Sequence, residues 1–298
     1  MNNKAVLEAP GWLDVEAYPF AHHWRSLSAG ALHYVDEGQG QPLLLVHGTP
    51  TWSFEYRHLI KALSSSRRCI AFDHLGFGLS ARPSDFSYSP EAHAQNAIEF
   101  IDSLGLSSFD LVVHDFGGPI GLPVLFRYPE RVRRLIIFNS WMWPFDDDKD
   151  MTRKARFAGS GLGRWMYRYL NASLRLIAPS AYGDKKKLTK KIHQQYLEVF
   201  PDKDSRSLVL WALAKSMLGS RDFFASLYAQ REALQKLPVQ IVWGLKDSAF
   251  LPAQLEKWRQ IIPQARVDTL KGAGHWPHEE EPEQVARWMT EFLSSEAG

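Results

Sequence analysis

Short apolar runs alternate with segments of helical spacing along the first half of the chain. One helix is predicted from Pro90 to Leu104, because Ser89 and Pro90 are typical of a helix start. Strands that alternate with helices indicate a parallel sheet covered by helices on both faces. The runs that predict strands are Trp24–Ser28 and Ala31–Asp36 as a pair, then Leu43–Val46, Arg68–Phe72, Asp110–Val113 and Leu135–Phe138.

The alternation stops between Asn139 and about Leu237. This segment is rich in Trp, Tyr, Arg and Lys, has helical spacing and shows no clear strand pattern. Strand patterns resume at Val239–Trp243 and Ala265–Leu270, and a C-terminal helix follows. We therefore expect an α/β fold with a helical cap inserted after the sixth strand. The expected domains are a core of residues 1–140 and 238–298 and a cap of residues 141–237.

Composition narrows the class of protein. A chain of 298 residues, 45% of them hydrophobic, can bury the core of one large domain with an insertion. Its 35 basic and 33 acidic residues give a net charge of +2, so we expect neither a nucleic acid nor a membrane as partner. The stretch Met1–Phe20 lacks a continuous apolar run, which predicts a cytoplasmic protein. Cys69, the single cysteine, is expected inside a buried strand.

A tight turn follows the apolar run Asp110–Val113. The segment Asp115–Gly118 contains a pair of glycines and leads into an apolar stretch with helical spacing. Strand, tight turn and helix in this order form the context of a nucleophile elbow, where one side chain is exposed at the apex of a strained turn. Here the apex residue is Asp115, whereas the motif G-x-S-x-G places serine there. The alternative is that Asp115 only caps the following helix.

Two later strands end in loops that carry an acid and a histidine. Val239–Trp243 is followed by Asp247, and Ala265–Leu270 is followed by His275 in a glycine-rich loop. The loops at the carboxyl ends of parallel strands meet at one edge of the sheet, so both side chains are expected to lie beside Asp115. Their order along the chain, nucleophile, acid and histidine, is that of α/β-hydrolases.

The whole chain outside the predicted cap resembles the haloalkane dehalogenase family of the α/β-hydrolase fold, and particularly its third subfamily. This resemblance implies that Asp115 is the nucleophile, His275 the base and Asp247 the residue that orients the base. It is carried by Tyr18–Phe20, His33–Gly38, His47–Phe54, Asp73–Gly78, His114–Gly118 and Asn139–Trp141.

The chemistry of these side chains agrees with such a role. A carboxylate is ionised at neutral pH and displaces a leaving group from an sp³ carbon without a base. The product is an ester on Asp115, and a water activated by His275 then hydrolyses it. The backbone N–H groups of Thr49 and Phe116 are candidates for the oxyanion hole. We expect no metal or cofactor, because no metal-ligand spacing and no G-x-G-x-x-G motif is visible.

Two positions depart from the family at the expected leaving-group site. Members of the family generally hold the halide with an indole directly after the nucleophile, together with an Asn after the His-Gly of the first loop or a Trp of the cap. Here Phe116 directly follows Asp115, and its side chain has no hydrogen-bond donor. Thr49 follows the His-Gly of the first loop, and its side chain has only a hydroxyl. Trp165 and Trp141 are the candidate indole donors for a halide or substrate.

Two enzymatic functions stay open on this basis. The first, which we favour, is cleavage of a carbon–halogen bond in a small apolar substrate. The second is opening of an epoxide or a β-lactone, whose leaving oxygen stays attached to the substrate. A non-catalytic binding protein of this fold is a minor alternative, because such proteins usually lose the nucleophile or the histidine. Phenol donors for an epoxide would come from the cap, which contains Tyr167, Tyr169, Tyr182, Tyr196 and Tyr228.

Overall fold

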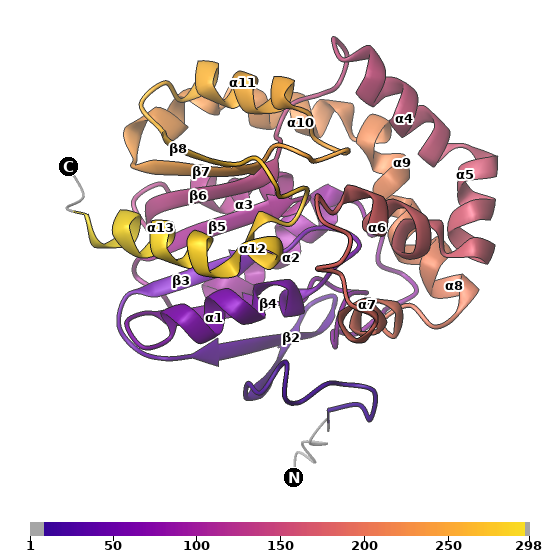
Figure 1. Ribbon diagram of the computed structural model, residues 1–298, viewed down its shortest axis with the longest axis horizontal. Helices are drawn as coiled ribbons and strands as arrows, with labels where there is room; N and C mark the ends of the chain where they lie inside the picture. The colour runs from indigo at the N-terminus through magenta and orange to yellow at the C-terminus, as the bar shows by residue number, and fades with distance from the viewer. Residues whose placement is uncertain (1–8, 296–298) are drawn as a thin grey trace.

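A single eight-stranded sheet forms the centre of the protein (Figure 1). The computed structural model describes residues 9–295. The strands lie in the order β1-β2-β4-β3-β5-β6-β7-β8, with β1 and β2 antiparallel to their neighbours and the others parallel. Their bounds are β1 (His22–Leu27), β2 (Gly30–Glu37), β3 (Pro42–Val46), β4 (Arg68–Phe72), β5 (Phe109–Asp115), β6 (Val132–Ser140), β7 (Val239–Gly244) and β8 (Arg266–Leu270).

Helices cover both faces of this sheet. In Figure 1, α1 and α13 pack together in front of the strands, and α2 and α3 pack together behind them. The helices outside the long insertion are η1 (Ser53–Tyr56), α1 (Arg57–Leu63), α2 (Pro90–Ser103), α3 (Gly117–Arg127), α11 (Pro252–Ile261), α12 (Pro277–Glu280) and α13 (Pro282–Ser294). None of the helices in the range 9–295 has the length and apolar character needed to cross a bilayer.

The central strands are buried on both faces, which explains their continuous apolar sequence. All seven residues of β5 are buried, and so are all six of β7. Cys69 in β4 is buried, as predicted. The predicted fold is therefore confirmed, and β4 has the predicted bounds. The main difference is β6, which begins three residues before the predicted Leu135 because Val132 and Arg134 also join the ladder with β5.

The chain between β6 and β7 contains helices and loops only; its first part, through α9, lies beyond the carboxyl ends of the strands (Figure 1), and its last part runs back along α3 and α11 to the start of β7. We infer that residues 141–237 form a cap domain, called here the cap segment. Its helical elements are α4 (Lys149–Gly159), α5 (Gly161–Trp165), η2 (Met166–Leu170), η3 (Ser173–Ile177), α6 (Ala178–Ala181), α7 (Lys190–Leu197), α8 (Lys203–Ser205), η4 (Arg206–Leu210), α9 (Trp211–Gly219), α10 (Arg221–Ala229) and η5 (Arg231–Lys236).

The start of α3 packs against the backbone of β3 with no room for a side chain. A Cβ atom on Gly117 would lie 2.1 Å from the backbone oxygen of Val46 and 2.9 Å from that of His47. Backbone atoms of a buried strand cannot move aside without disturbing the sheet. Glycine at this position therefore fixes how closely the helix approaches the sheet.

We expect Gly117→Ala to lower the free energy of unfolding by about 1–3 kcal/mol or more, because the added methyl overlaps the Val46 backbone. Denaturant unfolding monitored by circular dichroism measures this change. Gly219→Ala in α9 is the matched control, since a Cβ there meets nothing within 4 Å and alanine favours the helix. Equal stability of the two variants would contradict the packing argument.

Candidate active site

Asp115 stands at the apex of a strained turn between β5 and α3. Its φ is 50°, a left-handed conformation that non-glycine residues rarely adopt. One contact and one close approach define the turn. The hydroxyl of Ser140 in β6 donates to the backbone oxygen of Asp115 at 2.6 Å, and the loop after β3 passes so close that a Cβ on Gly48 would lie 2.3 Å from the Cβ of Asp115. The predicted order of strand, strained turn and helix is present at Asp115, and its side chain makes no capping hydrogen bond to α3.

The three side chains expected to act together lie in one line at the carboxyl edge of the sheet. Nε2 of His275 is 3.4 Å from Oδ2 of Asp115, and Nδ1 of His275 is 2.7 Å from Oδ2 of Asp247. All three residues are buried, and Asp115 retains 6% exposure. The ring of His275 thus stands between two carboxylates and contacts each through a different nitrogen.

The Asp247 carboxylate is held by further donors, one of which the sequence analysis missed. Nδ2 of Asn139 donates to Oδ2 of Asp247 at 2.8 Å, and the backbone N–H of Ala249 donates to Oδ1 at 2.6 Å. Asn139 also accepts from the backbone N–H of Gly244 at 2.9 Å. Asn139 belongs to one of the segments that carry the family resemblance, but no role followed from its place directly after a predicted strand.

The two carboxylates determine the charge of His275. Burial by itself lowers the pKa of the imidazole, but the charge of Asp247 and the contacts with Asp115 outweigh it and raise the pKa to about 10. The two carboxylates therefore hold a proton on His275 more tightly than a free imidazole would hold it. Loss of either negative charge would remove part of the force that holds this proton.

One of the two predicted oxyanion donors contacts the carboxylate of Asp115. The backbone N–H of Thr49 donates to Oδ1 of Asp115 at 2.8 Å. Phe116 follows Asp115 directly and caps the N-terminus of α3, where unpaired backbone N–H groups favour negative charge. The two oxygens of Asp115 thus differ in their surroundings, since Oδ1 faces a backbone donor and Oδ2 faces His275.

A mostly apolar cavity of about 120 Å³ opens beside Asp115 and His275. The core and the cap segment both contribute to its wall. The lining residues of the core are Thr49, Pro50, Asp115, Phe116, Ala249, Phe250, His275 and Trp276. Those of the cap segment are Trp141, Met151, Tyr167, Ser173, Ile177, Ala178, Ala181, Leu210, Ala214 and Met217.

Comparison with known proteins agrees with this arrangement. Residues 41–282 match the family described as alpha/beta hydrolase fold. Haloalkane dehalogenase 2 of Mycobacterium tuberculosis is 36% identical over 280 residues, which cover 93% of this chain and 96% of that protein. The chain belongs to the haloalkane dehalogenase family of α/β-hydrolases.

The chain is also similar to a protein with a different printed activity and to a solved structure. A cis-3-alkyl-4-alkyloxetan-2-one decarboxylase of Shewanella oneidensis is 34% identical over 284 residues, which cover 93% of this chain and 89% of that protein. The crystal structure of a loop variant of a haloalkane dehalogenase from Bradyrhizobium elkanii has a TM-score of 0.78 at 24% identity. The matched region covers 92% of this chain and 98% of that chain. At 24% identity, this similarity is evidence for the fold alone.

The two candidate indole donors of this haloalkane dehalogenase relative lie in different places. Trp141 is fully buried, lines the cavity and packs edge-on against Phe116, with ring centroids 4.7 Å apart. Its Nε1 has no hydrogen-bond partner among the described residues. Trp165 is 49% exposed, stands beside Tyr169 and does not line the cavity. The structure therefore does not support Trp165 as a halide donor, because the inner side of its helical segment is occupied by Tyr167 instead.

Only one of the five cap tyrosines lines the cavity. It is Tyr167, and burial raises its pKa to about 12, with the charge of Asp115 as a further cause. Tyr182 and Tyr196 donate to the buried carboxylate of Glu279, which also pairs with Arg57. The other two, Tyr169 and Tyr228, lie outside the lining, next to Arg168 and to Arg231 and Lys257 respectively.

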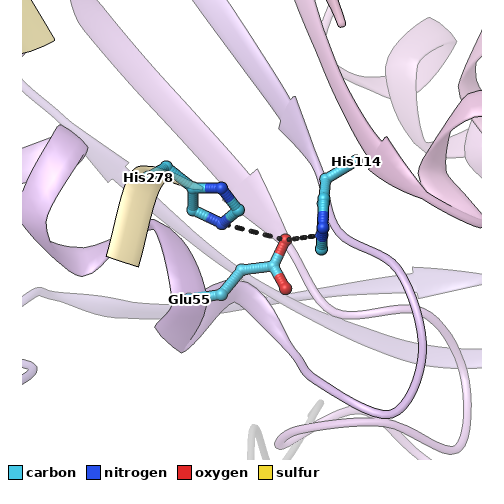
Figure 2. Close-up of side chains that lie close together, drawn as sticks. All are labelled: Glu55, His114 and His278. Carbon is cyan, nitrogen blue, oxygen red and sulfur yellow. Dashed lines mark hydrogen bonds and ion pairs between the residues drawn. The ribbon is translucent and has the colours of Figure 1, made fainter. Parts of the chain in front are cut away.

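A buried polar cluster lies behind the catalytic edge (Figure 2). Nδ1 of His114 is 3.1 Å from Oε1 of Glu55, and Nε2 of His278 is 3.6 Å from the same oxygen. All three side chains are completely buried, and their ligand atoms lie within 4.8 Å of one another, a spacing that a cation could occupy. The sequence analysis missed this cluster because its members come from η1, β5 and α12, far apart along the chain. The hydrogen bond between Glu55 and His114 explains why these two side chains lie so close together, and no bound cation is needed to explain it.

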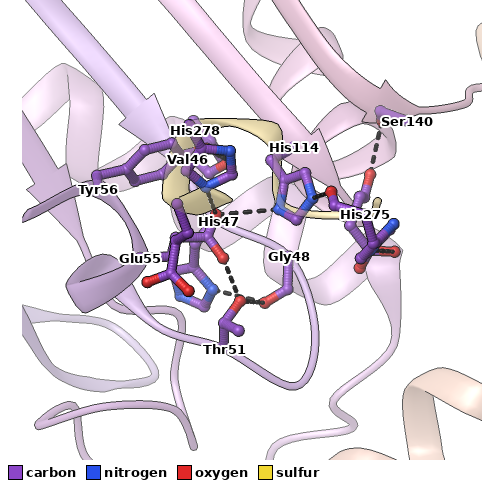
Figure 3. Close-up of polar contacts among 12 residues, drawn as sticks. Val46, His47, Gly48, Thr51, Glu55, Tyr56, His114, Ser140, His275 and His278 are labelled. Atoms are coloured by element: carbon purple, nitrogen blue, oxygen red, sulfur yellow. Dashed lines mark hydrogen bonds and ion pairs between the residues drawn. The ribbon is translucent and has the colours of Figure 1, made fainter. Parts of the chain in front are cut away.

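This cluster is connected to both sides of the site. Figure 3 shows His114 between Glu55 and the backbone of His275, whose carbonyl oxygen lies 2.8 Å from Nε2 of His114. A carbonyl can only accept, so Nε2 of His114 carries the hydrogen and donates it. On the other side, the hydroxyl of Thr51 contacts Oε2 of Glu55 and lies 3.4 Å from the backbone oxygen of Gly48. The buried pair of Glu55 and His114 thus connects the loop of His275 with the loop that contains Thr49.

Burial by itself raises the pKa of Glu55, but the neighbouring His114 and His278 outweigh it and hold the pKa well below its ordinary value of 4.5. Ionised Glu55 therefore stabilises the folded state above about pH 4.5, and this contribution is lost as the pH falls through the folded-state pKa.

We expect Glu55→Gln to lower the free energy of unfolding at pH 7 by about 3–5 kcal/mol, because it breaks a buried charge pair. The difference from the unchanged protein should shrink below pH 4.5, and urea unfolding at several pH values measures it. Glu256→Gln is the control, since Glu256 is exposed and lies 3.6 Å from Arg259. A pH-independent loss would show that packing, not charge, holds the cluster.

Proposed function

We propose that the protein hydrolyses a carbon–halogen bond in a small apolar substrate through an ester on Asp115. The observation that carries this proposal is a free indole N–H in the cavity wall. Trp141 lines the cavity beside the elbow, and its Nε1 is buried with no partner in the described chain. An unpaired buried donor is costly unless a ligand satisfies it, and a leaving halide is such a ligand. The similarity to a haloalkane dehalogenase of M. tuberculosis supports the same function.

The first step uses Asp115 as it stands. Oδ2 attacks the sp³ carbon, a C–O bond forms, and the halide leaves with the electron pair of the C–X bond. Oδ1 stays at the N–H of Thr49 and becomes the carbonyl oxygen of the ester. The apolar wall of the cavity suits an apolar substrate. Nε1–H of Trp141 donates a hydrogen bond to the departing halide and so replaces part of its lost hydration.

The second step follows from the change in charge. Esterification removes the negative charge of Asp115, which is one of the causes that raise the pKa of His275. The pKa therefore falls, the ring releases its proton, and Nε2 accepts a proton from a water that attacks the carboxyl carbon of Asp115. The tetrahedral oxyanion forms on Oδ1 at the backbone N–H groups of Thr49 and Phe116. Its collapse releases an alcohol and restores Asp115, with one halide and one proton as the other products.

A second candidate is the opening of an oxygen heterocycle by the same nucleophile. The specific observation that favours it is Tyr167, a phenol in the cavity wall with the charge of Asp115 close enough to affect its pKa. A phenol can donate to a leaving oxygen that stays attached to the substrate. The decarboxylase of S. oneidensis, named for an oxetan-2-one, which is a β-lactone, is a relative at 34% identity.

We expect His275→Phe to trap the ester, because the variant keeps the nucleophile and lacks the base. Intact-protein mass spectrometry after incubation with a bromoalkane, an epoxide or a β-lactone should show one added substrate fragment, and bromide release should stop after one equivalent. The double variant that also carries Asp115→Asn is the control and should show no adduct. An equal adduct on this control would locate the reaction elsewhere and refute the role of Asp115.

The leaving group can be identified with two single substitutions to phenylalanine. Trp141→Phe and Tyr167→Phe each remove one donor from the cavity wall with little change in shape. For halide as leaving group, Trp141→Phe should lower kcat/KM for a bromoalkane by about 10²-fold, while Tyr167→Phe changes it little. A larger loss with Tyr167→Phe, seen on an epoxide or a β-lactone, would instead establish the oxygen heterocycle as the substrate class.

A further inference from the structure

Exposed apolar side chains are concentrated on the cap segment. Among the described residues, ten large hydrophobic side chains are exposed, and all but Val15 and Leu251 belong to this segment. Six of them lie within residues 161–177, called here the roof segment, which comprises α5, η2 and η3. These six are Leu162, Trp165, Tyr169, Leu170, Leu176 and Ile177, with exposures of 43% to 58%. A cluster of this kind on a folded surface marks an interaction site.

The charge of the same region is strongly positive, although the whole chain is almost neutral. Residues 141–237 contain 18 basic and 10 acidic side chains, a net charge of +8, whereas the rest of the chain carries a net charge of −6. Between Met151 and Gly183 there are six basic and no acidic residues. Three of the six, Arg164, Arg168 and Arg175, alternate with the apolar residues of the roof segment. The overall charge of +2 thus conceals a basic pole at the cap.

The two sides of the roof segment face different surroundings. Tyr167 and Ser173 line the cavity, so the inner side of η2 and η3 forms part of its wall. Trp165 and Tyr169 precede and follow Tyr167 by two residues, which places them on the opposite side of the helical turn, and their rings lie 5.9 Å apart. Ile177 belongs to both sides, since it lines the cavity and is 45% exposed. The exposed apolar side chains therefore lie on the outer side of the wall whose inner side lines the cavity, and Ile177 reaches both sides.

We propose that the roof segment docks on an anionic lipid surface. Tryptophan, tyrosine and leucine interleaved with arginine are the side chains that enter the boundary between headgroups and acyl chains. A second copy of this chain is a poorer partner for this face, because two caps of charge +8 would repel each other. In this position Ile177, which lines the cavity and is 45% exposed, faces the lipid, so an apolar molecule dissolved in the membrane meets the cavity wall there. The lipid contact itself does not depend on the reaction proposed above.

Sedimentation with vesicles tests this proposal. The protein should bind vesicles that contain equal shares of phosphatidylcholine and phosphatidylglycerol and should bind phosphatidylcholine alone at least tenfold more weakly. Binding to the anionic vesicles should fall by tenfold or more at about 0.5 M salt, which screens the arginine contacts. Lack of binding to anionic vesicles, or equal binding to both kinds, would overturn the proposal.

Substitutions locate the docking surface. Trp165→Ser combined with Leu176→Ser should weaken binding to the anionic vesicles about tenfold, and Arg175→Glu alone should weaken it several-fold. Val15→Ser is the matched control, since Val15 is 62% exposed and lies outside the cap segment. All four substituted side chains are exposed, and thermal unfolding checks that each variant folds. Unchanged binding of the double variant, or a concentration-dependent dimer that the double variant abolishes, would show that the surface serves another partner.

Discussion

The close approach of three backbone segments at Asp115 is the constraint on which the site depends. A left-handed residue at the end of β5 is held by the hydroxyl of Ser140, by the N–H of Thr49 and by the start of α3 against β3. Each contact requires a small or specific residue, and the glycines at 48 and 117 leave no space for a side chain. The strain at Asp115 persists because the buried sheet around it determines the backbone on both sides. The position of the buried Asp115 carboxylate in the cavity wall follows from this packing.

The fold also buries carboxylates, and each of those described below has hydrogen-bonding or charged partners. Both oxygens of the buried Asp247 carboxylate have partners, from His275, Asn139 and the backbone N–H of Ala249. Glu55 is balanced by His114 and His278 in the same way. Because His114 also contacts the backbone of His275, the hydrogen bonds that stabilise the core also position the histidine. Stability and the geometry of the site are therefore coupled in this protein.

Residues of the core and of the cap segment together line the cavity beside Asp115. Phe116 fills the place where relatives generally have an indole, and it packs against Trp141. The unpaired N–H of Trp141 and the hydroxyl of Tyr167 enter the wall from the cap segment. The hydroxyl of Thr49 and Nε1 of Trp276 are also buried without a partner among the described residues, so the core and the cap segment both supply unpaired donors to the cavity wall.

The sequence by itself determined the alternation of strands and helices, the helical insertion and the meeting of Asp115, Asp247 and His275, because local periodicity and the topology of a parallel sheet dictate them. It could not decide which aromatic side chains line the cavity. Trp141 and Trp165 are equivalent as sequence candidates, but one lies in the wall and the other on the surface. The cluster of Glu55, His114 and His278 and the exposure of apolar side chains beside arginines on the cap segment were likewise decided by tertiary packing. The physical reason is the same in each case: side chains from distant segments become neighbours only when the sheet and the cap close on each other.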